Sequence, residues 1–113
     1  MTQPSTDIGR IALAGAQTIR NADDAGARLL ATLAGHSTVE IDCSATSEID
    51  LSIVQLILAA RKSALAAGKN LLLAQTATGV LHDVLMRGGF LHADPAAPRT
   101  DEQAFWLREA SAP

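Results

Sequence analysis

Residues 39–74, VEIDCSATSEIDLSIVQLILAARKSALAAGKNLLLA, carry the pattern that decides the fold. Apolar and acidic residues alternate over residues 39–43, which is the two-residue period of a strand. A long aliphatic stretch over residues 50–67 predicts a helix, and the apolar run 71–74 predicts a second strand covered on both faces. Two such strands joined by a helix form a parallel, right-handed βαβ unit, so we expect an α/β fold.

The segment before this unit predicts a further strand and helix. Residues 8–19 read as one strand, or as a strand with a bulge or short hairpin, because Gly15 interrupts their apolar residues. A helix is expected to begin after Asn21, a good N-cap residue, and to run to about Ala34, with Gly35 as its C-cap. Together these elements predict a mixed β-sheet of four to five strands with helices packed on it.

The segment after the unit predicts two more helices. The first covers residues 78–87 and has three apolar residues on its inner face. Residues 92–99 contain two prolines and read as a loop. The spacing of Thr100 and Gln103 matches a capping box, which predicts a short C-terminal helix that carries Phe105 and Trp106.

Length and composition indicate one domain. The chain has 113 residues, of which 48% are hydrophobic and 19% charged, which is enough apolar material for a single core. We expect a flexible N-terminal tail over residues 1–7 and a domain over residues 8–91. The loop and C-terminal helix of residues 92–113 are expected to pack on that domain.

Charge and cysteine content exclude several classes of protein. The net charge is −3 and only 3% of the residues are aromatic, which argues against a nucleic-acid binder. The single cysteine, Cys43, has no partner for an internal disulfide. The first residues lack the basic and apolar regions of a signal peptide, and no apolar stretch is long enough for membrane insertion. We therefore expect a cytoplasmic protein.

No motif of an enzyme is present in the sequence. Gly68-Lys69 resembles the end of a phosphate-binding loop, but the pair closes a helix instead of opening one. The three histidines show no metal-ligand spacing with one another or with Cys43. Cys43 shares a strand face with apolar residues, which favours a buried structural thiol over a nucleophile. We expect no catalytic residue, no cofactor and no metal.

The start of the central helix is the part of the sequence that carries most information about function. Asp50 is a natural N-cap residue, so Ser52 falls in the first turn, where free backbone N–H groups and the helix dipole favour a phosphate. The alternative is that Asp50 and Ser52 only cap and begin the helix. A phosphate on Ser52 would add a charge of about −1.5 to −2 beside Asp50 without unfolding the chain.

The central helix has one narrow polar or small stripe and an unusually wide apolar surface. The stripe, counted by threes and fours, contains Ser52, Gln55, Ala59, Lys62, Ser63 and Ala66. Apolar residues occupy most of the rest of the helix surface, which is wider than the usual buried face of a surface helix. Either the chain itself covers this surface, in part with the aromatic residues of its C-terminal helix, or a partner protein does.

These residues carry a resemblance to the STAS domain family, the bacterial anti-sigma factor antagonists. The strand VEIDCS over 39–44, the connector ATSEID over 45–50 and the Leu-Ser start of the aliphatic helix look like the core of that family. The family signature is an Asp-Ser-Ser-Gly or Asp-Thr/Ser-x-Gly turn. Leu51 replaces its first hydroxyl residue and Ile53 replaces its glycine. The amino-acid sequence of the helix looks most like that of small STAS proteins encoded in bacterial chemotaxis and signalling gene clusters.

The resemblance implies a non-enzymatic module that works by binding. By resemblance, Ser52 is the phosphoacceptor, Asp50 orients it, and Gln55 and Lys62 belong to the partner-binding surface. The implied partner is a serine kinase that is also an anti-sigma factor, or a chemotaxis protein, released when Ser52 is phosphorylated. A second interpretation is a constitutive adaptor, similar to the STAS subunit of a lipid-transporting ATPase complex. The oligomeric state and the identity of the partner stay open.

Overall fold

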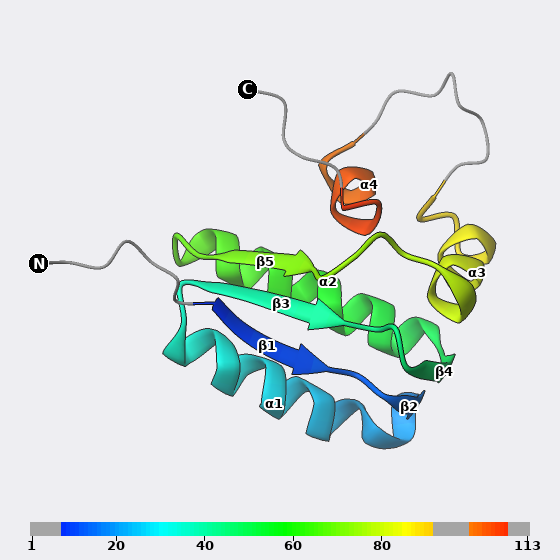
Figure 1. Cartoon of the computed structure of the whole chain (residues 1–113), viewed down its shortest axis with the longest axis horizontal. Helices are drawn as coiled ribbons and strands as arrows, with labels where there is room; N and C mark the ends of the chain where they lie inside the picture. The colour runs from blue at the N-terminus through cyan, green and yellow to red at the C-terminus, as the bar shows by residue number, and fades with distance from the viewer. Residues whose placement is uncertain (1–7, 92–99, 109–113) are drawn as a thin grey trace, which may run out of the picture.

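The computed structural model describes residues 8–91 and 100–108 and contains two parallel sheets (Figure 1). The larger sheet has the strand order β1-β3-β5. Its strands are β1 (Ile8–Ala12), β3 (Thr38–Asp42) and β5 (Asn70–Leu73). A smaller sheet pairs β2 (Gly15–Gln17) with β4 (Thr46–Ile49). The expectations for residues 1–7, 92–99 and 109–113 lie outside the described residues.

Four α-helices and one short turn complete the described fold. They are the 3-10 turn η1 (Ile19–Asn21), α1 (Ala22–Gly35), α2 (Leu51–Ala66), α3 (Gly79–Arg87) and α4 (Asp101–Trp106). Figure 1 shows α2 passing behind the strands, with α1 running below β1. Both helices lie against the same sheet face, since α1 contacts β1, α2 contacts β5 and the two helices contact each other. The expected βαβ unit is therefore present as β3-α2-β5, and the α/β fold class is confirmed.

The five strands form two sheets instead of one, and every pairing among the described residues is parallel. The hairpin considered for residues 8–19 is wrong, because β1 pairs with β3 whereas β2 pairs with β4. Gly15 has a φ of 75°, and the register of the β2–β4 pair shifts between Gly15 and Ala16. This irregularity redirects the chain toward the start of α2, which is how β2 comes to lie beside β4.

The core lies between the larger sheet and the helices. Val39 and Ile41 on the central strand are almost fully buried, whereas Arg10 on the opposite face of the sheet is exposed. The prediction that the strand at residues 71–74 is covered on both faces is wrong, because Leu72 is only half-buried. The helices α1 and α2 cover one face of the sheet, and Glu40 on the other face forms ion pairs with Arg10 and with Arg108, which follows α4.

The ends of α1 differ from the expectation. Asn21 occupies the N-cap position, but its side chain makes no cap hydrogen bond and donates instead to the side chain of Gln17 at 2.9 Å. Gly35 is the last helical residue and not the C-cap. The Lys69 ammonium group donates to the carbonyl oxygen of Leu33, which provides a partner for the end of the helix without a left-handed glycine.

The helix α4 packs beside β5 and contacts α2 at Arg61. The Thr100 hydroxyl accepts a hydrogen bond from the backbone N–H of Gln103 at 3.1 Å, and this bond caps the helix. Phe105 and Trp106 are buried. The guanidinium carbon of Arg61, on α2, lies 5.5 Å from the centre of the Phe105 ring. The C-terminal aromatic residues are therefore part of the core.

Candidate functional site

The start of α2 is organised around the carboxylate of Asp50. One oxygen, Oδ1, accepts hydrogen bonds from the backbone N–H of Ser52 at 3.0 Å and of Ile53 at 3.4 Å. The Ser52 hydroxyl donates to the same oxygen. The other oxygen, Oδ2, accepts from the backbone N–H of Ile19 at 2.9 Å. Asp50 therefore caps α2 and also holds the turn η1, which lies 31 residues away in the sequence.

These hydrogen bonds keep Asp50 ionised. The pKa of Asp50 is lowered from its ordinary value of 3.8, chiefly by the Ser52 hydroxyl and further by the backbone N–H groups of Ile19, Ile53 and Ser52, against a smaller opposing effect of burial. The positive end of the α2 dipole also favours a carboxylate at this position. The Ser52 hydroxyl thus lies beside a stable negative charge.

Acid is expected to remove the stabilisation that the charge of Asp50 supplies. Because the pKa of Asp50 is lower in the folded protein than 3.8, folding favours the ionised form above that pH, and the benefit is lost as the pH falls through the folded-state pKa. Asp50→Asn keeps a cap acceptor but removes the charge. We expect the wild type to be more stable than this variant by about 0.3–1 kcal/mol at neutral pH.

Urea unfolding of both proteins at about pH 7 and about pH 3 measures this difference in the free energy of unfolding. The gap between wild type and Asp50→Asn should shrink at the lower pH. A gap that stays constant over this range would contradict a role for the ionised carboxylate. Glu48→Gln is the matched control, because Glu48 is an exposed carboxylate two residues away.

The structure brings two of the four expected site residues into direct contact and leaves the other two along α2. Asp50 and Ser52 are hydrogen-bonded, and both are half-buried. Gln55 and Lys62 are exposed on α2. At a rise of about 1.5 Å per residue, Gln55 lies about one turn from Ser52 and Lys62 about 15 Å away. A single small group at Ser52 therefore contacts Gln55 more readily than Lys62.

Ile19 is a site residue that sequence reasoning missed. Its backbone N–H binds Asp50, and its side chain is 68% exposed. Nothing local to residues 48–52 signals this contact, because it depends on β2 lying beside β4. The signal in the sequence that could have pointed to Ile19 is that it is an apolar residue between the polar residues Thr18 and Arg20.

A second Asp-x-Ser segment lies at the end of β3. The Asp42 carboxylate accepts a hydrogen bond from the backbone N–H of Ser44 at 2.8 Å. The pKa of Asp42 is lowered, first by the Ser44 hydroxyl and then by this N–H group. Ser44 is exposed and does not begin a helix. It therefore serves as a comparison for Ser52, with a similar local geometry but no helix N-terminus.

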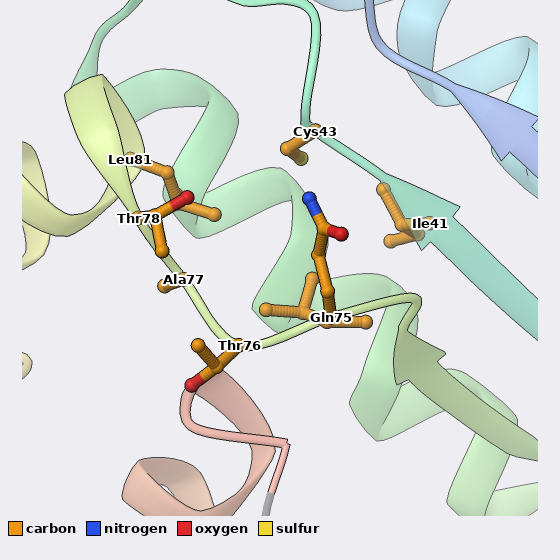
Figure 2. Close-up of a pocket in the computed structure, with 8 residues that line it drawn as sticks. Ile41, Cys43, Gln75, Thr76, Ala77, Thr78 and Leu81 are labelled. Carbon is orange, nitrogen blue, oxygen red and sulfur yellow. The ribbon is translucent and has the colours of Figure 1, made fainter.

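A small cavity opens where the β5–α3 connection passes the end of β3 (Figure 2). Its volume of about 10 Å³ has room for one water molecule. The lining residues are Ile41, Cys43, Leu73, Gln75, Thr76, Ala77, Thr78 and Leu81. Burial raises the pKa of the Cys43 thiol to about 11, so this group is protonated and a poor nucleophile at neutral pH. The cavity does not suit a substrate.

The described part of the chain shows neither a cluster of metal-binding side chains nor a membrane-spanning helix. Within residues 8–91 and 100–108, no group of three or more histidine, cysteine, aspartate or glutamate side chains is placed to hold a metal ion. None of the helices in these ranges has the length and apolarity required to cross a membrane.

Comparison with known proteins gives the family. The model of the family described as Mlab, STAS domain, matches residues 1–92, and the chain belongs to the STAS domain family. The described α4 lies beyond the matched residues. A search of curated proteins found no match.

Two solved structures share the fold. The anti-sigma factor antagonist SpoIIAA in its unphosphorylated form is 16% identical, with a TM-score of 0.58 over 74% of this chain and 76% of that chain. A sulfate transporter family protein from Wolinella succinogenes is 19% identical, with a TM-score of 0.58 over 79% of this chain and 72% of that chain. At these identities the likeness establishes the fold alone.

Proposed function

We propose that this protein is a non-enzymatic signalling module of the bacterial cytoplasm, similar to the anti-sigma factor antagonists, that binds a protein partner and is switched by phosphorylation of Ser52. The observation that carries the proposal is the hydrogen bond between the Ser52 hydroxyl and the ionised Asp50 at the start of α2. The fold shared with an anti-sigma factor antagonist supports the same function. The partner is a serine kinase that doubles as an anti-sigma factor, or a chemotaxis protein.

The position of Ser52 suits a reversible charge switch. The first turn of α2 presents backbone N–H groups and the positive end of the helix dipole, which stabilise a phosphate. A phosphoserine with a charge of about −1.5 to −2 repels the Asp50 carboxylate and competes with it for those N–H groups. The modification therefore changes the surface around Ser52, while the core residues of α2 stay in place.

Phosphorylation of Ser52 is tested with purified components. The chain is incubated with ATP and each candidate serine kinase from the same genome, and the modified residue is located by mass spectrometry. We expect one phosphate on Ser52, which is lost in Ser52→Ala. Ser44→Ala is the matched control, because Ser44 also lies two residues after an aspartate and is more exposed than the half-buried Ser52. The modification level of Ser44→Ala should equal that of the wild type.

Phosphate on another residue, or none with any candidate kinase, would overturn the proposal. Binding supplies a second readout. The unphosphorylated chain should bind the kinase, and the phosphorylated chain should bind it more weakly by about tenfold or more, which corresponds to about 1.4 kcal/mol.

A constitutive adaptor is the second candidate, in which Gln55 and Lys62 contact a transporter ATPase and Ser52 acts only in the cap. The observation that favours it is the fold shared with a sulfate transporter family protein. Leu51 and Ile53 also depart from the phosphorylated turn of the anti-sigma factor antagonists. Stable co-purification with an ATPase subunit, unchanged by Ser52→Ala or by phosphoserine at position 52, would favour the adaptor over the switch.

A further inference from the structure

Two exposed large apolar side chains flank Asp50. Ile19 is 68% exposed and donates its backbone N–H to Asp50, and Leu51 is 45% exposed and follows Asp50 in the chain. We call them the Ile19–Leu51 pair. The other exposed large apolar side chains of the described residues are Ile8, Leu30 and Leu65. Single exposed apolar residues are common on protein surfaces, but two beside one candidate site have the composition of an interface centre.

Acidic residues lie within a few positions of Ile19 and Leu51 in the chain. Glu48 is exposed near the end of β4, and Asp23 and Asp24 are exposed in the first turn of α1, which directly follows η1. Asp50 itself is ionised. In these segments and in α3, which contacts β4, the exposed cationic residues are Arg20 and Arg87. They accompany five carboxylates, those of Asp23, Asp24, Glu48, Asp50 and Asp83. A partner surface that complements this charge carries basic side chains around an apolar centre.

Asp50 connects the Ser52 hydroxyl to the backbone of Ile19. Its Oδ1 accepts from the hydroxyl, and its Oδ2 accepts from the Ile19 N–H at 2.9 Å. A phosphorylated Ser52 has no hydroxyl proton to donate and repels the carboxylate. Asp50 must then move away from Ser52, and the N–H group of Ile19 loses its acceptor.

We propose that the Ile19–Leu51 pair is the apolar centre of the surface that a basic protein partner contacts, and that Asp50 sets the position of Ile19 according to the state of Ser52. The inference rests on the proposed function, because it describes how the phosphorylated site is recognised. The phosphate itself extends into solvent, where added negative charge attracts a basic partner only weakly. Displacement of an apolar residue from the centre of an interface has the larger effect, so phosphorylation releases the partner.

The coupling is tested in the isolated chain by hydrogen exchange of the Ile19 amide, measured by NMR. Phosphoserine is incorporated at position 52 during translation, so this experiment requires no kinase. Exchange at Ile19 should rise by about tenfold or more in the phosphorylated protein and in Asp50→Ala. Asp42→Ala, which removes the similar Asp-x-Ser contact, should leave it unchanged. An Ile19 amide that does not respond to phosphoserine overturns the coupling.

The contact surface is tested by binding to the purified serine kinase. Ile19→Ala and Leu51→Ala should each weaken binding of the unphosphorylated chain by about tenfold. The matched controls are Leu30→Ala and Leu65→Ala, at 58% and 55% exposure, which should bind as the wild type does. Association with the wild type should slow as salt is raised.

The outcomes separate the two proposals. If Ile19→Ala and Leu51→Ala bind as the wild type does, the contact surface is wrong although Ser52 phosphorylation stands. If no phosphate reaches Ser52 while these variants lose binding, the switch fails and the contact surface stands. If the wild type does not bind the kinase, the proposed contact is overturned, and the exchange experiment still decides the coupling.

Discussion

Replacement of Trp106 by alanine is expected to lower the free energy of unfolding by about 3–5 kcal/mol, one of the two largest effects on stability that we predict. Trp106 is fully buried, and its ring meets that of Phe105 edge to face, with 4.8 Å between the centroids. Its backbone carbonyl accepts a hydrogen bond from the N–H of Ala77 at 2.8 Å. Truncation leaves a large cavity, and it removes one of the two buried aromatic side chains of α4.

Urea unfolding followed by circular dichroism measures this loss without using the tryptophan as the probe. Leu65→Ala is the control, because Leu65 is exposed and its truncation should change stability by about 0.5 kcal/mol or less. Trp106→Phe keeps part of the packing and also removes the indole N–H, which is buried without a hydrogen-bond partner. Its loss should therefore be smaller than that of Trp106→Ala. A loss below about 1 kcal/mol for Trp106→Ala would show that α4 contributes little to stability.

Restoring the glycine of the family turn at position 53 is expected to destabilise this protein. Ile53 is fully buried in the core, so Ile53→Ala should cost about 2–5 kcal/mol. Ile53→Gly should cost about 0.5–1 kcal/mol more, because glycine loses more backbone entropy in a helix. Ile53 thus has a structural role in this chain, which gives a physical reason for the departure from the family motif.

Thermal or urea unfolding of the two variants tests this expectation. Ala59→Gly is the matched control, since Ala59 is an exposed residue of the same helix and its replacement isolates the backbone contribution of about 1 kcal/mol. If Ile53→Gly is no less stable than Ala59→Gly, burial of Ile53 adds nothing to the stability of the fold. Phosphorylation of Ser52 in Ile53→Gly further tests whether the family glycine improves access of the kinase.

Much of the fold could be predicted because its signals are local. The alternation around Val39, the aliphatic run of α2 and the inner face of α3 each follow from residues a few positions apart. The Asp50 cap is also local, since its partners Ser52 and Ile53 follow directly. The ends of α1 were predicted less well, because the Lys69 ammonium group binds the end of that helix from a distant segment.

The candidate site likewise combines contacts that are local in the sequence with contacts that depend on the tertiary structure. Asp50 and Ser52 could be paired from the sequence, because the geometry of a helix N-terminus depends on neighbouring residues. The contact between Asp50 and Ile19 could not be predicted, since it requires β2 to lie beside β4. Gln55 and Lys62 share the exposed stripe as expected, and their part in partner binding stays a prediction.

The sequence by itself determined the βαβ unit, the cap at Asp50 and the polar stripe of α2, because periodicity and capping are read from residues close together in the chain. Only the tertiary structure decided that the strands form two sheets and that Phe105 of α4 lies near Arg61 of α2. It also placed Ile19 against Asp50. These contacts join segments about 30 or more residues apart, and their geometry depends on where the folded chain returns, which no local pattern specifies.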